Sequence, residues 1–146
     1  MEEINQVPPI ASSARVLHGF LLGGSICILV AMALIVKFMG SRLGSASFAE
    51  VFGMIFAVVA LINILIGVVL FRPKIPKRQP DQSADDYWPE AMGRAMMVWV
   101  FAEGGCIIAS LGYLMSGTTV TWVVALTGIG ILMWLRPGQL DRQHTP

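Results

Sequence analysis

The chain has 146 residues, of which 55% are hydrophobic and only 13% are charged, and its formal net charge is +1. Soluble domains carry about 25% charged residues. The composition, with a mean hydropathy of +0.72, therefore excludes a disordered chain, a nucleic-acid-binding protein and an ordinary soluble enzyme. Two cysteines are too few for a disulfide framework or a cysteine zinc site. What remains is a small polytopic membrane protein.

Four apolar runs predict membrane-spanning helices, which need about 20 residues each. The runs cover residues 16–38, 48–71, 95–115 and 119–135. Helices are expected because every backbone amide in lipid must pair within its own segment, and the runs lack the alternation of barrel strands. We predict an all-α fold, a four-transmembrane-helix bundle that forms a single membrane domain over 1–146.

The basic residues predict the orientation of the chain. One side of the membrane would hold eight Lys and Arg residues, and the other side only Lys37 and Arg42. By the positive-inside rule, both termini, the 72–94 linker and the 136–146 tail would lie in the cytoplasm. The first half of the linker is basic and rich in proline, which favours an extended segment close to anionic lipid. Near its end, Pro89 indicates the start of the third helix.

The two halves of the chain share a pattern that predicts two parallel-repeat helical hairpins. A Gly-Gly pair follows a phenylalanine in the first and third spans, and an Arg-Pro pair closes the second and fourth. Chance recurrence of glycine pairs is the alternative. Small residues let membrane helices approach closely. The glycines expected at helix contacts are Gly23, Gly24, Gly104, Gly105, Gly128 and Gly130.

Each span also carries one polar residue at a common depth. Glu103, Asn63 and Thr127 each lie nine residues from the cytoplasmic arginine of their span, and Ser25 lies ten. At about 1.5 Å per residue this is about 14 Å deep, close to the midplane of a bilayer core about 30 Å thick. Two interpretations stay open. The four residues form a proton or cation site, or a protonated Glu103 hydrogen-bonds to Asn63 and fixes the helix register.

Other candidate residues give weaker signals. His18 lies near the start of the first span, where interfacial hydrogen bonding is expected rather than metal or haem ligation. The sequence contains no nucleophile elbow, Walker motif, dinucleotide fingerprint or metal-ligand spacing. We therefore expect no enzymatic activity, no cofactor and no metal.

The run from Arg94 to Gly104, with Arg136-Pro137 after the last span, resembles a pattern in uncharacterised small four-helix membrane proteins of bacteria. That resemblance implies the fold and the bacterial inner membrane, but no activity. The duplicated hairpin with a midplane acid is also similar to rotor-ring proteolipids, although their acid lies on the second helix of a hairpin and Glu103 lies on the first.

The function expected from these features is that of a non-enzymatic membrane protein. It would be an accessory or assembly subunit of a larger membrane complex, or a self-associating bundle. Its partners would be the lipid bilayer and other membrane subunits or itself, without nucleic acid. The alternative is a proton- or cation-coupled transporter, or a conducting subunit, that uses Glu103.

Overall fold

The computed structural model describes residues 10–40, 46–79 and 81–140, and nearly all of them are helical. No strand occurs within these ranges, so the prediction of an all-α fold is confirmed. In chain order the elements are α1 (Ile10–Met39), α2 (Ala46–Leu65), the π-helical turn η1 (Ile66–Phe71), the 3-10 turn η2 (Arg72–Lys74), α3 (Ala84–Ser116), α4 (Thr119–Trp134) and α5 (Pro137–Leu140).

Within the described ranges, three helical segments are long and apolar enough to cross a membrane. They are Ile10–Met39, Ser47–Lys74 and Ala84–Ser116. The fourth apolar helix, Thr119–Trp134, is shorter. This helix content agrees with a helical membrane bundle, because a helix satisfies its own backbone hydrogen bonds in lipid.

The third helix begins well before the point that the sequence indicated. Ser83 caps α3: its Oγ accepts a hydrogen bond from the backbone N–H of Asp86 (3.1 Å). Asp85 and Asp86 then place negative charge in the first turn, where the helix dipole favours it. As a result, Pro89 lies inside the helix rather than at its start, and of the described residues in the expected 72–94 linker only 75–79 and 81–83 lie outside helical segments.

A tight turn joins α3 to α4. Gly117 ends α3 with a left-handed backbone (φ 66°), and its N–H donates to the carbonyl of Tyr113 (2.7 Å). Glycine takes this conformation without the steric cost of a Cβ. The two helices therefore run antiparallel with only two residues between them.

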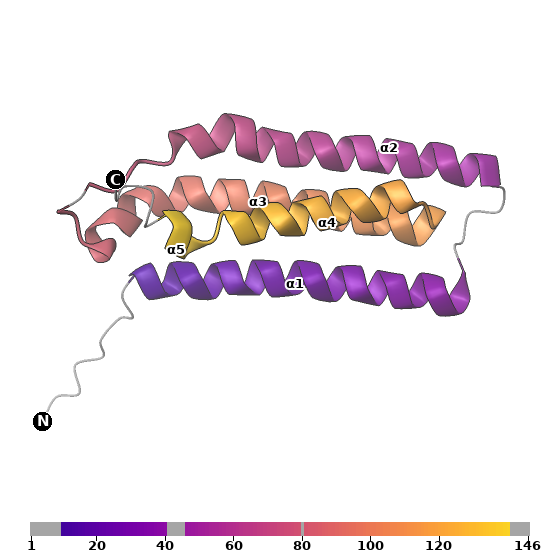
Figure 1. Cartoon of the computed structure of the whole chain (residues 1–146), viewed down its shortest axis with the longest axis horizontal. Coiled ribbons are helices and arrows are strands. Elements are labelled where there is room, and N and C mark those ends of the chain that lie inside the picture. The colour runs from indigo at the N-terminus through magenta and orange to yellow at the C-terminus, as the bar shows by residue number, and fades with distance from the viewer. Residues whose placement is uncertain (1–9, 41–45, 80, 141–146) are drawn as a thin grey trace, which may run out of the picture.

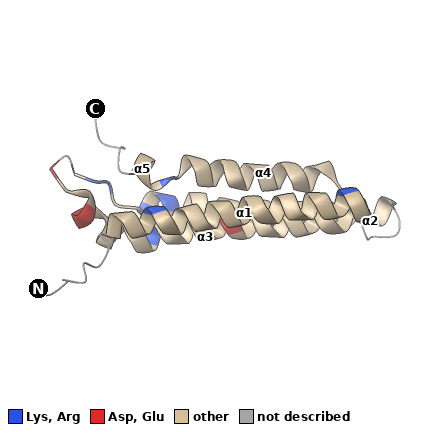
Figure 2. Ribbon diagram, turned by 90° about the horizontal axis from the view of Figure 1, so that it is seen from below, with Lys and Arg blue, Asp and Glu red and all other residues tan. Residues whose placement is uncertain are grey.

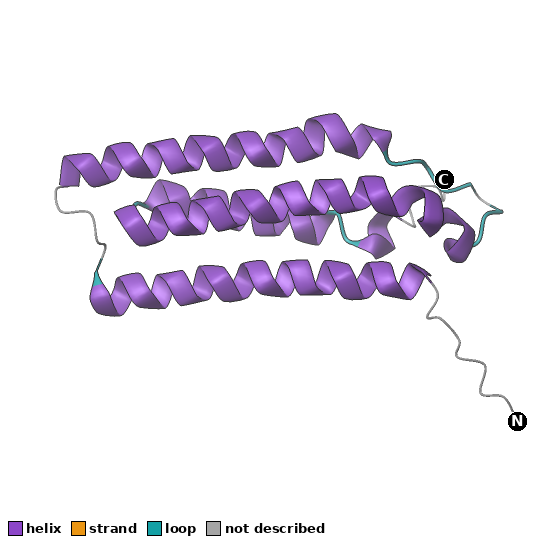
Figure 3. Ribbon diagram, turned by 180° about the vertical axis from the view of Figure 1, so that it is seen from behind, coloured by secondary structure: helices purple, strands orange, loops and turns teal. Residues whose placement is uncertain are grey.

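The α3–α4 hairpin forms the middle of the bundle, and α1 and α2 flank it on opposite sides (Figures 1 and 3). The helix α3 packs against α1, α2 and α4, whereas α1 and α2 make almost no contact with each other. The two expected hairpins therefore pack differently. The helices of the second hairpin, α3 and α4, contact each other, whereas those of the first, α1 and α2, are separated by α3. The start of α1 lies at the same end of the bundle as α5 (Figure 1).

The interior has two clusters of buried side chains. The cluster near α5 is built around the aromatic residues Tyr87, Trp88 and Trp99. The second cluster consists mostly of small residues, and its members are Leu29, Ala60, Cys106, Ala109 and Ala125. Small side chains at helix contacts are typical of membrane bundles, because dispersion contacts between close backbones hold such helices together.

Most of the basic residues lie at the end of the bundle that holds α5 (Figure 2). Lys37 occupies the last turn of α1, at the opposite end. Arg42 and the part of the 136–146 tail beyond Leu140 lie outside the described residues.

Candidate functional site

Asn63 on α2 and Glu103 on α3, which were expected to share one depth, lie close together, but they do not form the expected hydrogen bond. Asn63 on α2 donates its side-chain N–H to the backbone carbonyl of Phe101 on α3 (3.0 Å). Among the described residues, Glu103 has neither a hydrogen-bond partner nor an ion-pair partner, and its side chain is partly exposed. The amide of Asn63 therefore joins the two helices through the backbone and leaves the carboxyl group of Glu103 without a partner.

The first helix reaches the same level through Gly24 and Ser25. A Cβ at Gly24 would lie 3.7 Å from Oε1 of Glu103, so α1 passes close to the carboxyl group. Ser25 is fully buried, and its Oγ has no nitrogen or oxygen partner within the described part of the chain, although it lies beside the thiol of Cys106 on α3. Three helices thus meet at this level with a carboxyl group, an amide and a buried hydroxyl.

Thr127, the fourth residue of the expected layer, is not part of this group. Its side chain is exposed on the outer face of α4, and its Oγ1 donates to the carbonyl of Val123 in its own helix (2.9 Å). Counting from Arg136 gave its position along the helix axis but not the direction in which the side chain points. Within a helix, each residue turns that direction by about 100°.

Of the glycines expected at helix contacts, some lie against a neighbouring helix and others do not. A Cβ at Gly104 would lie 2.8 Å from the amide nitrogen of Asn63, and one at Gly128 would lie 3.2 Å from Cβ of Cys106. At Gly105 it would lie 2.8 Å from the carbonyl oxygen of Ala60. At Gly23 and Gly130, by contrast, an added Cβ would meet nothing within 4 Å.

Three further contact glycines were not identified from the sequence. Gly53, Gly67 and Gly112 each leave too little room for a Cβ, since side chains of a neighbouring helix lie against them. The sequence did contain a pattern that indicates these contacts, because small residues recur at intervals of three and four along the second span. On α2 the buried positions are Ala49, Gly53, Ala57, Ala60 and Ile64, and Gly67 on η1 continues the spacing.

His18 and Trp99 bind the end of α4. Nε2 of His18 lies 2.9 Å from the carbonyl oxygen of Leu132, and Nε1 of Trp99 donates to the carbonyl of Leu135 at 2.9 Å. The last carbonyls of a helix lack partners within the helix, so these two side chains satisfy them. The rings of His18 and Trp99 meet edge to face, with centroids 5.1 Å apart. The hydrogen bond expected for His18 is therefore present, and it joins α1 to α4. The role of Trp99 was not anticipated.

One face of α3 is left uncovered between α1 and α2. We call it the α3 stripe. It consists of Met96, Met97, Val100, Glu103, Ile107 and Leu111, which recur at intervals of three and four. Met97 is 49% exposed and Val100 is 45% exposed, although α3 is the central helix of the bundle. Glu103 is the only charged residue of the stripe.

No group of three or more His, Cys, Asp or Glu side chains that could hold a metal ion occurs in the described part of the chain. Comparisons of the sequence and structure with models of protein families, with curated proteins and with solved structures give no match.

Proposed function

We propose that this chain is a non-enzymatic integral membrane protein whose role is to associate with other membrane helices through the α3 stripe. It would serve as an accessory or assembly subunit of a larger complex, or it would assemble with copies of itself. The proposed setting is the bacterial inner membrane, with four spans and both termini in the cytoplasm, because the basic residues gather at one end of the bundle.

The observation that supports this proposal is the carboxyl group of Glu103. Acidic residues at the midplane of a membrane almost always face a bundle interior or a partner, since leaving one in lipid costs several kcal/mol. Glu103 has no partner among the described residues, and it lies on a face that α1 and α2 leave open. A hydrogen-bonding group on another helix, at the same depth, would remove this cost.

The first test is the mass of the intact protein isolated from its native membrane in mild detergent. We expect a particle larger than one protomer of 15.8 kDa, either with other chains in fixed stoichiometry or as a homo-oligomer. A monomer that carries no other chain would contradict the proposal.

Substitutions of Glu103 locate the contact. Glu103→Gln keeps a hydrogen-bonding side chain of the same shape, so we expect association to survive, whereas Glu103→Leu should weaken it. Thr127→Val is the matched control, because Thr127 lies at a similar expected depth but is already bonded within α4. Association that is equally weak in the Thr127 and Glu103→Leu variants would locate the contact elsewhere.

The second candidate function is proton- or cation-coupled transport through Glu103. The buried Oγ of Ser25, which has no nitrogen or oxygen partner among the described residues, favours it, because this oxygen and the carboxyl group lie at one level of the bundle. The two functions separate in one variant. Glu103→Gln cannot ionise, so a transporter should lose proton flux into vesicles while the protein stays folded and associated.

A further inference from the structure

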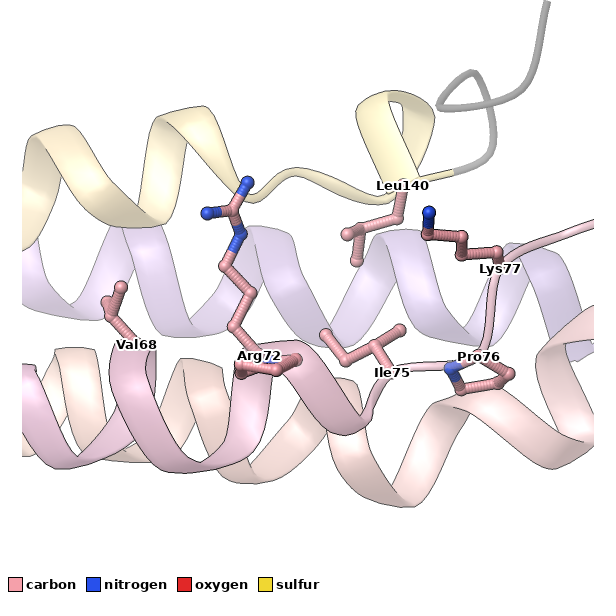
Figure 4. A pocket seen from close by; sticks show the side chains of 7 residues that line it. Val68, Arg72, Ile75, Pro76, Lys77 and Leu140 are labelled. Carbon is pink, nitrogen blue, oxygen red and sulfur yellow. The ribbon is translucent and has the colours of Figure 1, made fainter.

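A pocket of about 310 Å³ opens at the basic end of the bundle, between the turn after η1 and the short helix α5. Figure 4 shows the side chain of Arg72 reaching toward the end of α4 and that of Lys77 lying beside α5, with their cationic groups on opposite sides of Leu140. Val68, Ile75 and Leu140 give the pocket apolar walls. The pocket therefore combines two cationic side chains with an apolar lining.

No acidic side chain within the described residues neutralises the two cations. The guanidinium of Arg72 stacks over the ring of Trp134, 4.0 Å from its centroid, which orients the group and preserves its charge. Lys77 is exposed and has no hydrogen-bond or ion-pair partner in the described ranges. Neither cation pairs with a carboxylate among residues 10–40, 46–79 and 81–140.

The backbone beside the pocket is held in place by α3. Arg94 donates from Nη1 to the carbonyl of Lys74 (2.6 Å), and this bond ties the η2 turn to the central helix. The N–H of Ile75 donates to the carbonyl of Arg72 (3.1 Å). Arg72 and the segment that leads to Lys77 therefore sit on a braced turn rather than on a free loop.

The position of the pocket defines the ligand. Arg72 lies at the end of the apolar segment Ser47–Lys74, so the pocket lies where apolar helix surface gives way to charged residues. Pockets of this kind bind anionic lipid headgroups on the cytoplasmic side of membrane proteins, and arginine matches the geometry of phosphate. We propose that Arg72 and Lys77 bind the phosphate headgroup of an anionic phospholipid, whose acyl chains lie on the apolar surface that begins at Val68.

The test is a lipid titration of the purified full-length protein in detergent, read by native mass spectrometry. Phosphatidylglycerol and phosphatidylcholine with identical acyl chains are compared. We expect a preference for phosphatidylglycerol that weakens about fivefold in Lys77→Gln and about 30-fold when Arg72→Gln is added. Lys37→Gln is the matched control, since it makes the same change in net charge at the other end of the bundle, and it should bind like the wild type.

Three outcomes would overturn the proposal. Equal binding of phosphatidylglycerol to the wild type and to Lys77→Gln would show that Lys77 does not contribute to binding the lipid. An equal loss in Lys37→Gln would show diffuse attraction by net charge. Inorganic phosphate that binds with the same dependence on Arg72 and Lys77, and that phosphatidylglycerol fails to displace, would identify a soluble anion as the ligand. Lys77 is exposed and has no partner, so its variant folds and keeps the test decisive if the Arg72 variant does not.

Trp134 provides a second readout within the site. Brominated acyl chains quench tryptophan fluorescence on contact, and the ring of Trp134 is 47% exposed beside Arg72. At equal mole fractions, brominated phosphatidylglycerol should quench the wild type more than brominated phosphatidylcholine does. Lys77→Gln should reduce this excess, and adding Arg72→Gln should reduce it further. An excess that is undiminished in the Lys77→Gln variant would refute the assignment.

Discussion

Gly105 gives the sharpest test of how the central helices pack. It lies on α3 where α2 crosses, and a Cβ at this position would lie 2.8 Å from the carbonyl oxygen of Ala60 and collide with Cγ1 of Ile64. Cβ atoms in proteins essentially never come within 3.0 Å of another heavy atom. Because one of the obstructing atoms belongs to the backbone of α2, Gly105→Ala must push the two helices apart.

The expected free-energy change has two opposing parts. Overpacking of this kind costs about 1–3 kcal/mol, whereas replacing glycine by alanine inside a helix gains about 1 kcal/mol. Gly105→Ala should therefore lower the free energy of unfolding by up to about 2 kcal/mol. Gly130→Ala is the matched control, because an added Cβ there meets nothing within 4 Å and only the gain remains.

The assay is equilibrium unfolding in mixed micelles with increasing SDS, followed by far-ultraviolet circular dichroism. The difference between the two alanine variants cancels the helix-propensity gain and isolates the cost of packing, about 1–3 kcal/mol. Equal stabilities for Gly105→Ala and Gly130→Ala would refute the close approach of α2 and α3 at this position.

Three further results are expected. Trp99→Phe removes a hydrogen bond to the end of α4 and should destabilise the protein about 1 kcal/mol more than Trp88→Phe does in the same unfolding assay. Trp88 is the control because its buried indole N–H has no acceptor among the described residues. Equal losses of stability in the two variants would contradict this expectation. A lipid-soluble maleimide should label the exposed Cys27 and spare the buried Cys106, giving one label per folded chain by mass spectrometry and two in SDS. Ser83→Ala removes the N-cap of α3 at a cost of about 1 kcal/mol, so amide exchange in the first turn should be about fivefold faster, and unchanged exchange would argue against the cap.

The sequence alone indicated that the chain is helical. Long apolar runs with few charges can satisfy their backbone in lipid only as helices, and the four runs overlap α1, α2 with η1, α3 and α4, although α1 and α3 extend beyond them and α5 was not predicted. The sequence indicated that His18 would form a hydrogen bond, but it did not indicate that this bond is buried and accepted by the carbonyl of Leu132 on α4. The start of α3 was placed too late, because proline at a first helical turn is a weaker signal than the Ser83 cap and the acidic residues after it.

Only the tertiary structure decided which residues meet. Distance along a helix gives the depth of a side chain, but each residue also rotates its side chain by about 100° around the axis, and packing alone fixes that rotation. Because of this packing, the side-chain amide of Asn63 donates its hydrogen bond to the carbonyl of Phe101 rather than to Glu103. It also placed Thr127 on the outer face of α4. Packing of α1 and α2 on opposite sides of α3 left Glu103 on an open face, because the small residues that bring helices together occupy the other faces of α3.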